Sequence, residues 1–250
     1  MTNLVCHRGL AKVAPENTIP AFTQAFKASA DGIEFDVQLT KDKEIVVCHD
    51  NSVNRTSNGK GNIKDMTLKE LRELDFGEKF DEKYKGTKIP TLKEVLDISR
   101  GFKMINIELK AQGGGDLDLA QRVLFEVRYN KYDNYTVYSS FDLNLVKEMK
   151  RQDSNCVTAF IYSQKGMLKY QLAKKYTQFA VENELDYLHP NYQAMDKHYI
   201  KNCHEKGIGV NVWGADCKMA KIKLIKAGLD CLTTDDIDSV IKIRDKYIER

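Results

Sequence analysis

The chain has 250 residues, of which 42% are hydrophobic and 30% are charged, the balance of a globular protein with a full hydrophobic core. Its 39 basic and 36 acidic residues give a formal net charge of +3, without the concentrated basic face that nucleic-acid binding usually requires. No apolar stretch approaches the ~20 residues that span a bilayer, so we expect no stable membrane insertion.

The chain enters its first predicted strand, residues 4–7, after only three residues. That leaves no room for the basic and apolar segments of a secretory leader. The six cysteines show no CxxC pair and no zinc-ligand spacing, and Cys6 and Cys48 lie in apolar strands, where a buried thiol is the commonest state. We therefore expect reduced thiols and a cytoplasmic location.

Strand-like and helical segments then alternate along almost the whole chain. The eight predicted strands cover residues 4–7, 33–37, 104–109, 136–139, 156–162, 187–189, 209–213 and 231–234. The predicted helices cover residues 19–30, 92–99, 117–129, 142–151, 168–179, 196–206, 215–227 and 237–250. This rhythm predicts an α/β fold of the (β/α)8 TIM barrel type. A doubly wound sheet is the alternative, but no GxGxxG motif opens the first helix.

An additional strand at residues 45–49 is predicted to return antiparallel to the second strand. With Asp42 and Lys43 as a two-residue loop, Asp36 lies directly opposite His49, and opposed residues have Cβ atoms roughly 4.5–5.5 Å apart. A slip of one residue would turn His49 to the other face of the hairpin. The predicted register therefore brings a carboxylate and a histidine together.

Residues 51–90 interrupt the alternation and are predicted to form a small insertion after the second strand. The insertion contains a short helix at 68–74, with a capping box that begins at Thr67. It is too small for an independent domain, so we expect one domain over residues 1–250. The three glycines at 113–115 predict a loop at the barrel mouth and not a phosphate loop, because no Gly-Lys-Ser/Thr follows.

Polar side chains gather at the carboxyl ends of the predicted strands, where the working residues of such barrels lie. Glu34, Asp36 and Glu108 form an all-oxygen set that suits one divalent cation, Ca²⁺ or Mg²⁺, better than zinc. Without a cation the three carboxylates would repel one another. The alternative is that they only pair with Arg8 and Lys110, which otherwise offer donors for a phosphate group.

Two histidines are candidates for proton transfer. His7 and His49 follow predicted strands, and the ordinary pKa of histidine allows them to act as acid and base near neutral pH. His189 and Trp213 also lie at strand ends. Each of these two either lines the substrate pocket or serves only local structure, the first in shaping a His-Pro loop and the second in barrel packing.

These residues belong to a series of short motifs whose order and spacing resemble the glycerophosphodiester phosphodiesterase family from residue 4 to about 142. Beyond that point the similarity is loose, through Val212-Trp213 and Thr233-Thr234-Asp235. The matching motifs are His7-Arg8-Gly9, Pro15-Glu16-Asn17-Thr18, Gly32-Ile33-Glu34-Phe35-Asp36-Val37, Thr40-Lys41-Asp42, His49-Asp50, Arg55-Thr56, Gly59-Lys60-Gly61, Ile89-Pro90-Thr91-Leu92, Asn106-Ile107-Glu108-Leu109-Lys110 and Ser140-Phe141.

The resemblance implies a barrel with a small insertion after the second strand. It also implies a phosphoric diester hydrolase of lipid and glycerol metabolism that releases glycerol 3-phosphate and an alcohol from small glycerophosphodiesters. Carried over residue by residue, the matching positions are metal ligands (Glu34, Asp36 and Glu108), an acid/base pair (His7 and His49) and phosphate contacts (Arg8 and Lys110). Family members often have Trp-Thr-Val-Asn where this chain has Trp213-Gly214-Ala215-Asp216, a difference that concerns the substrate pocket.

The chemistry that the resemblance implies has two steps, with a cyclic phosphate formed by attack of the glycerol 2-hydroxyl and then opened by water. Two alternatives remain at the level of the sequence. A lysophospholipase D-type or sphingolipid phosphodiesterase would use the same residues, and a non-catalytic barrel would only bind a phosphate ligand. The sequence offers no basis for predicting an oligomeric state.

Overall fold

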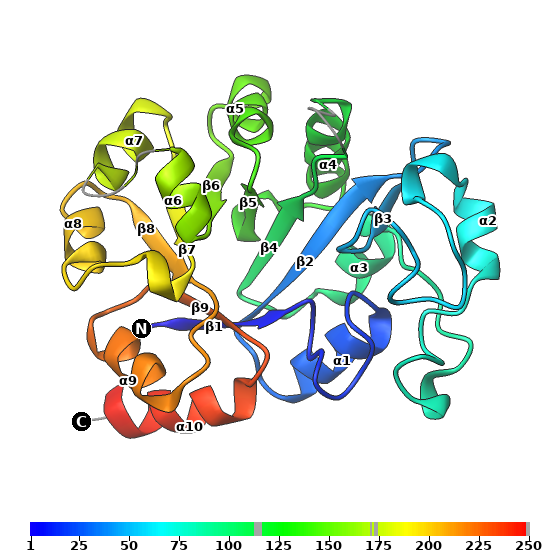
Figure 1. Cartoon of the computed structure of the whole chain (residues 1–250), viewed down its shortest axis with the longest axis horizontal. Helices are drawn as coiled ribbons and strands as arrows, with labels where there is room; N and C mark the ends of the chain where they lie inside the picture. Colours follow the sequence, from blue (N-terminus) through cyan, green and yellow to red (C-terminus); the bar gives the residue numbers. More distant parts are fainter. Residues whose placement is uncertain (113–116, 171, 173–174, 249–250) are drawn as a thin grey trace.

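The computed structural model describes residues 1–112, 117–170, 172 and 175–248. Eight parallel strands close into a barrel, as predicted (Figure 1). Around the barrel the strands are β1 (Asn3–His7), β9 (Cys231–Thr234), β8 (Gly209–Val212), β7 (Tyr187–Pro190), β6 (Val157–Tyr162), β5 (Thr136–Ser140), β4 (Met104–Leu109) and β2 (Gly32–Leu39), which pairs with β1.

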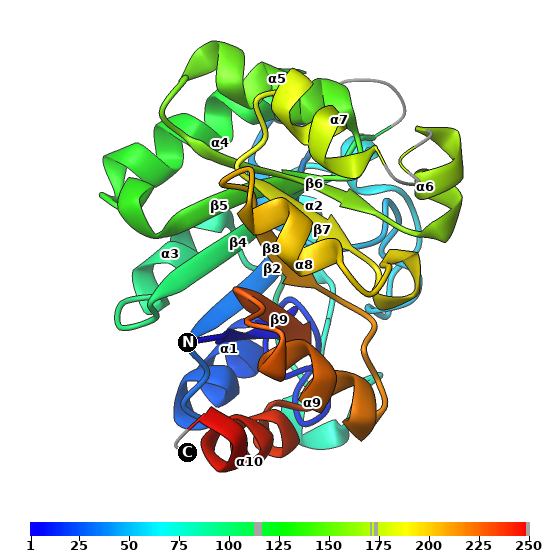
Figure 2. The same cartoon turned by 90° about the vertical axis from the view of Figure 1, so that its left-hand side faces the viewer.

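Helices surround the strands in both views (Figures 1 and 2). They are α1 (Ile19–Lys27), α3 (Leu92–Ile98), α4 (Leu117–Tyr129), α5 (Leu143–Gln152), α6 (Gln164–Lys169), α7 (Tyr176–Glu182), α8 (Tyr199–His204), α9 (Lys218–Lys226) and α10 (Ile237–Ile248), with 3-10 turns at Asp133–Tyr135 and Tyr192–Ala194. Within the described residues, no helix is both long enough and apolar enough to cross a bilayer.

The single helix predicted at residues 168–179 was wrong. The described chain forms α6 and α7 instead, with a turn at Tyr170 between them. The Ser163 hydroxyl caps α6 by accepting a hydrogen bond from the Gly166 N–H, so this helix begins four residues before the predicted start. The apolar spacing that suggested one helix continues across both, because Leu172 and Tyr176 are both buried. Apolar spacing alone therefore did not reveal the break.

Side chains along each strand alternate between the barrel interior and the helical layer. The outward set packs with the helices into the main hydrophobic core. The inward set begins with an apolar layer near the amino ends of the strands and becomes polar toward the carboxyl ends. This apolar layer consists of Val5, Met104, Val137, Ala159 and Cys231.

The hairpin after β2 has a register that differs by one residue from the predicted one. Its return strand, β3 (Ile45–Val47), pairs so that Val37 lies opposite Val47. The Thr40 N–H donates to the Glu44 carbonyl oxygen at 3.0 Å, which encloses a three-residue loop. Lys43 closes the loop in the left-handed region, with φ of 66°. The prediction assumed a two-residue loop and was therefore wrong about this turn.

This register places Cys48 opposite Asp36, and the Cys48 N–H donates to the Asp36 carbonyl oxygen at 2.9 Å. The predicted direct pairing of Asp36 with His49 was consequently wrong. His49 nevertheless reaches the barrel mouth, because β3 ends at Val47 and His49 lies beyond the paired ladder. The alternation of faces along a strand no longer constrains its side chain there.

Residues 51–90 contain α2 (Leu68–Glu73) and two 3-10 turns, Ile63–Asp65 and Glu82–Tyr84. The predicted capping box at Thr67 is present, with hydrogen bonds in both directions between Thr67 and Glu70. The segment builds a small apolar cluster with the hairpin, formed by Val46, Cys48, Val53, Ile63, Leu71, Phe76 and Ile89. That one domain spans residues 1–250 stays a prediction, and the glycine loop at 113–115 lies outside the described residues.

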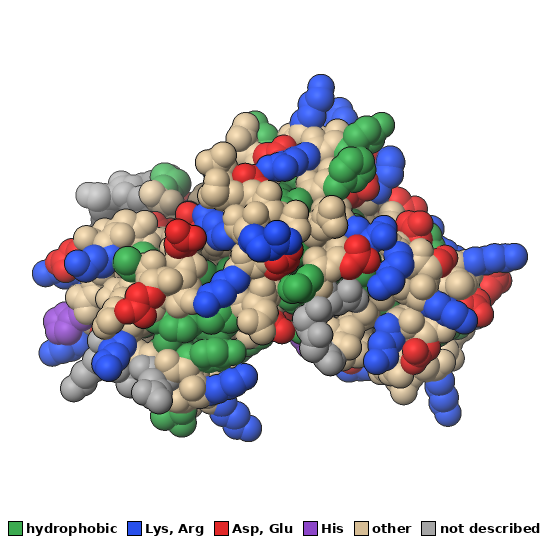
Figure 3. Space-filling view, turned by 90° about the horizontal axis from the view of Figure 1, so that it is seen from above, with side chains coloured by type: hydrophobic (Ala, Val, Ile, Leu, Met, Phe, Trp, Pro, Cys, Tyr) green, Lys and Arg blue, Asp and Glu red, His purple; other side chains and the backbone are tan. Residues whose placement is uncertain are grey.

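On the face drawn in Figure 3, lysine and arginine side chains are intermixed with aspartate and glutamate over the described residues. Several of these charges belong to surface ion pairs, such as Lys93 with Asp97 at 3.0 Å on α3. Exposed pairs of this kind contribute little to stability, about 0.3–0.5 kcal/mol each on a helix. The stability of the barrel therefore depends mainly on its core and on buried polar contacts.

Asp31, just before β2, makes such a buried contact at the amino end of the barrel. Its carboxylate accepts hydrogen bonds from the Leu4 N–H at 3.0 Å, from Lys103 Nζ at 2.7 Å and from the Arg244 guanidinium, and the residue is 6% exposed. Burial raises its pKa, but these three donors more than compensate, so the pKa lies below the ordinary 3.8. One side chain thus links β1, the residue just before β4, and α10.

We expect Asp31→Asn to lower the free energy of unfolding at neutral pH by on the order of 3 kcal/mol, because it leaves the largely buried Arg244 guanidinium with only the exposed Asp245 as a carboxylate partner. Since the native pKa is depressed, the contribution is complete above the unfolded-state pKa and is lost as the pH falls toward the native value. Urea unfolding of both proteins from neutral pH downward should show their stabilities converging in acid. A gap that widens in acid would contradict this prediction.

Candidate active site

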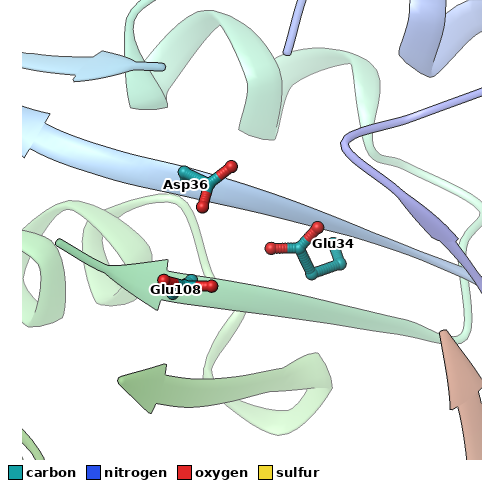
Figure 4. Close-up of side chains that lie close together, drawn as sticks. All are labelled: Glu34, Asp36 and Glu108. Carbon is teal, nitrogen blue, oxygen red and sulfur yellow. The ribbon is translucent and has the colours of Figure 1, made fainter. Parts of the chain in front are cut away.

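Three buried carboxylates lie together on the adjacent strands β2 and β4 (Figure 4). Asp36 pairs in register with Glu108, and Glu34 precedes Asp36 by two residues, so all three side chains point to the same face. One oxygen of each lies within 4.8 Å of the others. The structure therefore brings together the three residues predicted as metal ligands.

Two cations flank this carboxylate cluster. Arg8 Nε lies 3.4 Å from Asp36 Oδ2, and Lys110 Nζ lies 2.6 Å from Glu108 Oε1 and 3.5 Å from Asp36 Oδ1. Arg8 and Lys110 thus form the ion pairs with carboxylates that were considered as their alternative role. Two positive charges do not balance three ionised carboxylates, so full ionisation of the cluster would leave an excess of negative charge.

The pKa values of the cluster reflect this excess. Burial and the neighbouring Asp36 raise the pKa of Glu34 and of Glu108 above the ordinary value of 4.5. Burial also opposes ionisation of Asp36, but Lys110 and Arg8 hold its pKa below the ordinary range. Asp36 is therefore the ionised member, and its two neighbours resist ionisation beside it.

The donor set fits a hard divalent cation. Asp36 Oδ1 is buried and has no hydrogen-bond partner within the described residues, although buried polar atoms are normally bonded. Asp36 Oδ2, by contrast, accepts a hydrogen bond from the Asn17 side-chain amide at 2.8 Å. One oxygen of Asp36 is thus fixed by a hydrogen bond, while the other accepts none and has only the Lys110 ammonium group 3.5 Å away. All ligand atoms are oxygens, as Ca²⁺ and Mg²⁺ prefer. The cluster can therefore hold a metal ion.

Arg8 owes its position to a sharp turn after β1. Its backbone adopts a φ of 55°, which residues other than glycine rarely do, and such strain is typical of functional sites. The turn directs the Arg8 N–H to Glu34 Oε2 at 3.0 Å and its guanidinium to Glu16 Oε1 at 2.9 Å. Arg8 is thereby tied to the carboxylate cluster through its backbone and its side chain.

His7 lies at the end of β1 and is oriented by the last strand of the barrel. Its Nδ1 lies 2.9 Å from Asp235 Oδ1, just after β9. Burial lowers the pKa of His7, but Asp235 and Glu34 outweigh that effect and raise the pKa to about 9. With Nδ1 engaged by Asp235, Nε2 is the nitrogen available to a substrate.

His49 is held by a chain of ion pairs that includes a residue of the insertion. Its Nδ1 lies 2.7 Å from Asp50 Oδ1, and Arg55 binds Asp50 through two hydrogen bonds of 2.8 and 3.0 Å. Arg55 also binds both oxygens of Glu16, which in turn contacts Arg8. Burial lowers the pKa of His49. Residues 51–90 thus fix the second histidine relative to the first.

These groups surround one cavity of about 380 Å³ at the carboxyl ends of the strands. Of the predicted site residues, His7, Arg8, Glu34, His49, Glu108, His189 and Trp213 line it, whereas Asp36 and Lys110 lie directly behind the lining. Trp213 donates a hydrogen bond from Nε1 to the His189 carbonyl oxygen at 3.0 Å and packs edge-to-face on Phe141. The structure therefore unites all nine predicted residues.

Residues that orient the site were absent from the predicted set, among them Asn17, Asp50, Arg55 and Asp235. The first three fall within the closely matching motifs and Asp235 falls within the loosely similar Thr233-Thr234-Asp235, so all four were marked in the sequence but had no assigned role. Asp235 continues the inward alternation of β9 past its end, two residues after Thr233. Only its partner, 228 residues away, gives it a role.

The chain is similar to known proteins over nearly its whole length. The family model described as "Glycerophosphoryl diester phosphodiesterase family" matches residues 7–239. A glycerophosphodiester phosphodiesterase of Caldanaerobacter subterraneus subsp. tengcongensis is 35% identical over 244 residues, 97% of each chain. The crystal structure of glycerophosphodiester phosphodiesterase from Agrobacterium tumefaciens has a TM-score of 0.83 at 26% identity, covering 97% of this chain and 100% of that chain. An Oleispira antarctica phosphodiesterase in complex with the product sn-glycerol-3-phosphate has a TM-score of 0.89 at 23% identity, covering 98% and 97%.

Proposed function

The chain belongs to the glycerophosphodiester phosphodiesterase family and is an enzyme of that class, and we propose that it cleaves small glycerophosphodiesters by metal-dependent acid–base catalysis. The observation that supports this proposal best is the common cavity, in which two histidines face a cluster of three carboxylates. A purely phosphate-binding barrel would need neither the carboxylates nor a second histidine. The products are glycerol 3-phosphate and the alcohol of the substrate.

Glu34, Asp36 and Glu108 would hold one Ca²⁺ or Mg²⁺ ion. When bound, such an ion supplies positive charge that stabilises the charge developing on the phosphoryl oxygens. Arg8 and Lys110 orient the same oxygens, since both cations lie beside the cluster and are mostly buried. In a site of low polarity such fixed charges act more strongly than they would in water.

The two histidines transfer protons in opposite directions. One accepts the proton of the glycerol 2-hydroxyl as its oxygen bonds to phosphorus, and the other donates a proton to the alcohol oxygen as its bond to phosphorus breaks. This step yields a five-membered cyclic phosphate and the free alcohol. Water then attacks phosphorus and loses its proton to the second histidine, while the opening 2-oxygen takes the proton held by the first. Both histidines return to their starting states.

The carboxylates beside the two imidazoles support this role. Asp235 and Asp50 each engage an Nδ1 atom, which orients the ring and leaves Nε2 for the substrate. Asp50 also forms an ion pair with Arg55. Asp235, by contrast, has no arginine or lysine within ion-pair distance in the described part of the chain. The two histidines therefore lie in different electrostatic surroundings, as opposite roles in one step require. The cytoplasmic location stays a prediction.

Release of glycerol 3-phosphate from glycerophosphocholine, glycerophosphoethanolamine and glycerophosphoglycerol tests the proposed function. We expect turnover that EDTA abolishes and that Mg²⁺ or Ca²⁺ restores, since the three carboxylates resist full ionisation without a cation between them. Folded protein without activity on any of the three diesters, with either metal, would contradict the proposal. Release of the alcohol from lysophospholipids alone would instead support the lysophospholipase D-type alternative.

A further inference from the structure

The cavity has a second polar side that the proposed reaction does not use. Strands β7 and β8 lie four places from β2 and β4 around the eight-stranded ring, and therefore across the barrel from the carboxylates. They direct His189 and Asn211 into the cavity, and β9 adds Thr233 beside them. We call these three residues the neutral wall. All three are buried, with exposures of 2%, 2% and 7%.

Hydrogen bonds within the neutral wall leave donors free. The Thr233 hydroxyl donates to Asn211 Oδ1 at 3.0 Å, which fixes the amide and leaves its NH₂ group without a protein acceptor in the described residues. The His189 ring likewise makes no hydrogen bond with any described residue, and burial lowers its pKa to about 3, so it is uncharged at neutral pH. The unpaired polar atoms of both residues are not enclosed by protein but open onto the cavity. Both line the cavity, where a ligand can supply the missing hydrogen-bond partners.

The chemistry of the neutral wall defines its ligand. An uncharged imidazole and an amide NH₂ group bind a neutral group with oxygen acceptors, such as a hydroxyl, and give no preference to a charged one. A phosphate is better placed near Arg8 and Lys110, across the cavity. An apolar group is better placed at the mouth, against Phe141 and Trp213. A hydroxyl group that extends inward from the phosphate is the remaining fit.

We propose that His189 and Asn211 bind the terminal hydroxymethyl group of the glycerol and make the enzyme selective for glycerol over smaller 2-hydroxyalkyl diesters. This inference rests on the proposed function, because it takes the phosphate and the attacking 2-hydroxyl to lie at the carboxylate side. The leaving alcohol then projects toward the mouth. A diester in which the glycerol is replaced by a 2-hydroxyethyl group keeps its reacting atoms. It leaves the polar groups of His189 and Asn211 without a substrate partner.

Two diesters with the same leaving alcohol test the inference: glycerophosphocholine and 2-hydroxyethyl phosphocholine. Both carry the hydroxyl that attacks phosphorus, and only the first carries the hydroxymethyl group. We expect the wild type to favour glycerophosphocholine by about 10²-fold in kcat/KM, because buried donors left unpaired penalise the smaller substrate. Equal kcat/KM values for the two would overturn the inference and leave the proposed function intact, whereas failure to cleave either diester would count against both.

Variants locate the source of that selectivity. Asn211→Leu and His189→Phe should each reduce the ratio of the two kcat/KM values by about 10-fold, measured on one sample so that partial misfolding cancels. Ile161→Val is the matched control, since Ile161 lines the same cavity beside His189 without a polar group and should keep the wild-type ratio. A change in the preference between choline and ethanolamine esters, with the hydroxymethyl ratio preserved, would assign the neutral wall to the leaving alcohol and overturn the inference.

Discussion

Replacing Glu34 by glutamine is expected to reduce turnover by about 10³-fold, because it replaces one of three charged oxygen ligands of the metal cluster with a neutral amide. The same variant should leave the metal-free protein at least as stable as the wild type. Glutamine keeps a carbonyl oxygen that can accept the hydrogen bond from the Arg8 N–H, which lies 3.0 Å from Glu34 Oε2. The substitution thus removes charge and leaves the local structure in place.

The sign of the stability effect follows from the raised pKa of Glu34. Burial and Asp36 raise it above the ordinary 4.5, so ionising this carboxyl at neutral or alkaline pH costs the native state free energy that the unfolded chain does not pay. Glutamine removes that cost. A bound divalent cation also removes it, so the wild type should gain thermal stability when Mg²⁺ or Ca²⁺ is added and the variant should gain less.

Thermal unfolding in EDTA and in excess metal, together with kcat, checks both parts of this prediction. Glu148→Gln is the control, because Glu148 lies on α5 and its pKa is lowered to about 2 by hydrogen bonds from Arg151 and Gln152. The expected effect on stability therefore has the opposite sign to that of Glu34→Gln. Glu148→Gln should lose stability at neutral pH and keep its activity. Equal metal-induced stabilisation of Glu34→Gln and the wild type would exclude Glu34 as a ligand.

Removing either histidine is the second change with a large expected effect. His7→Ala and His49→Ala should each lower kcat by at least about 10²-fold, the usual contribution of a general acid or base. The double variant should be hardly less active than either single one, because the two groups act as a unit. Circular dichroism establishes that the variants are folded, and a folded variant with near wild-type turnover would remove that histidine from the mechanism.

A substrate with a better leaving group separates the two roles. The 4-nitrophenyl ester of glycerol 3-phosphate releases a phenolate that needs no proton, so the general acid of the first step becomes dispensable. One of the two alanine variants, and only one, should regain most of its first-step rate, measured as the initial release of 4-nitrophenolate, because ring opening by water still needs that histidine as a base. Recovery of both variants or of neither would show that the first step does not divide acid and base between His7 and His49.

The local pattern of the sequence was sufficient to predict most of the fold. Alternating strand and helix segments predicted the barrel, and the period of two placed Glu34 and Asp36 on one face. The bounds of β4 and of α4 agree with the predicted ranges 104–109 and 117–129. These features depend on interactions between near neighbours along the chain, which a single sequence displays directly.

The hairpin shows where local pattern was insufficient. A three-residue loop and a two-residue loop differ by one residue of register, and the choice depended on whether Lys43 adopts the left-handed conformation. No Asn-Gly or Asp-Gly pair marked that choice in the sequence. The position of His49 then depended on where β3 stops pairing, because beyond that point the alternation of faces no longer applies.

The sequence by itself determined which chemical groups are available: three carboxylates, two histidines and two cations at strand ends, in motifs of a known family. Only the tertiary structure decided which group contacts and orients which other group. Asp235 reaches His7 because β9 pairs with β1 to close the barrel, and Arg55 reaches Glu16, 39 residues away, because the insertion lies beside the segment between β1 and α1. Such contacts arise from closure of the whole sheet and the packing of an irregular segment, and no short stretch of the chain encodes either one.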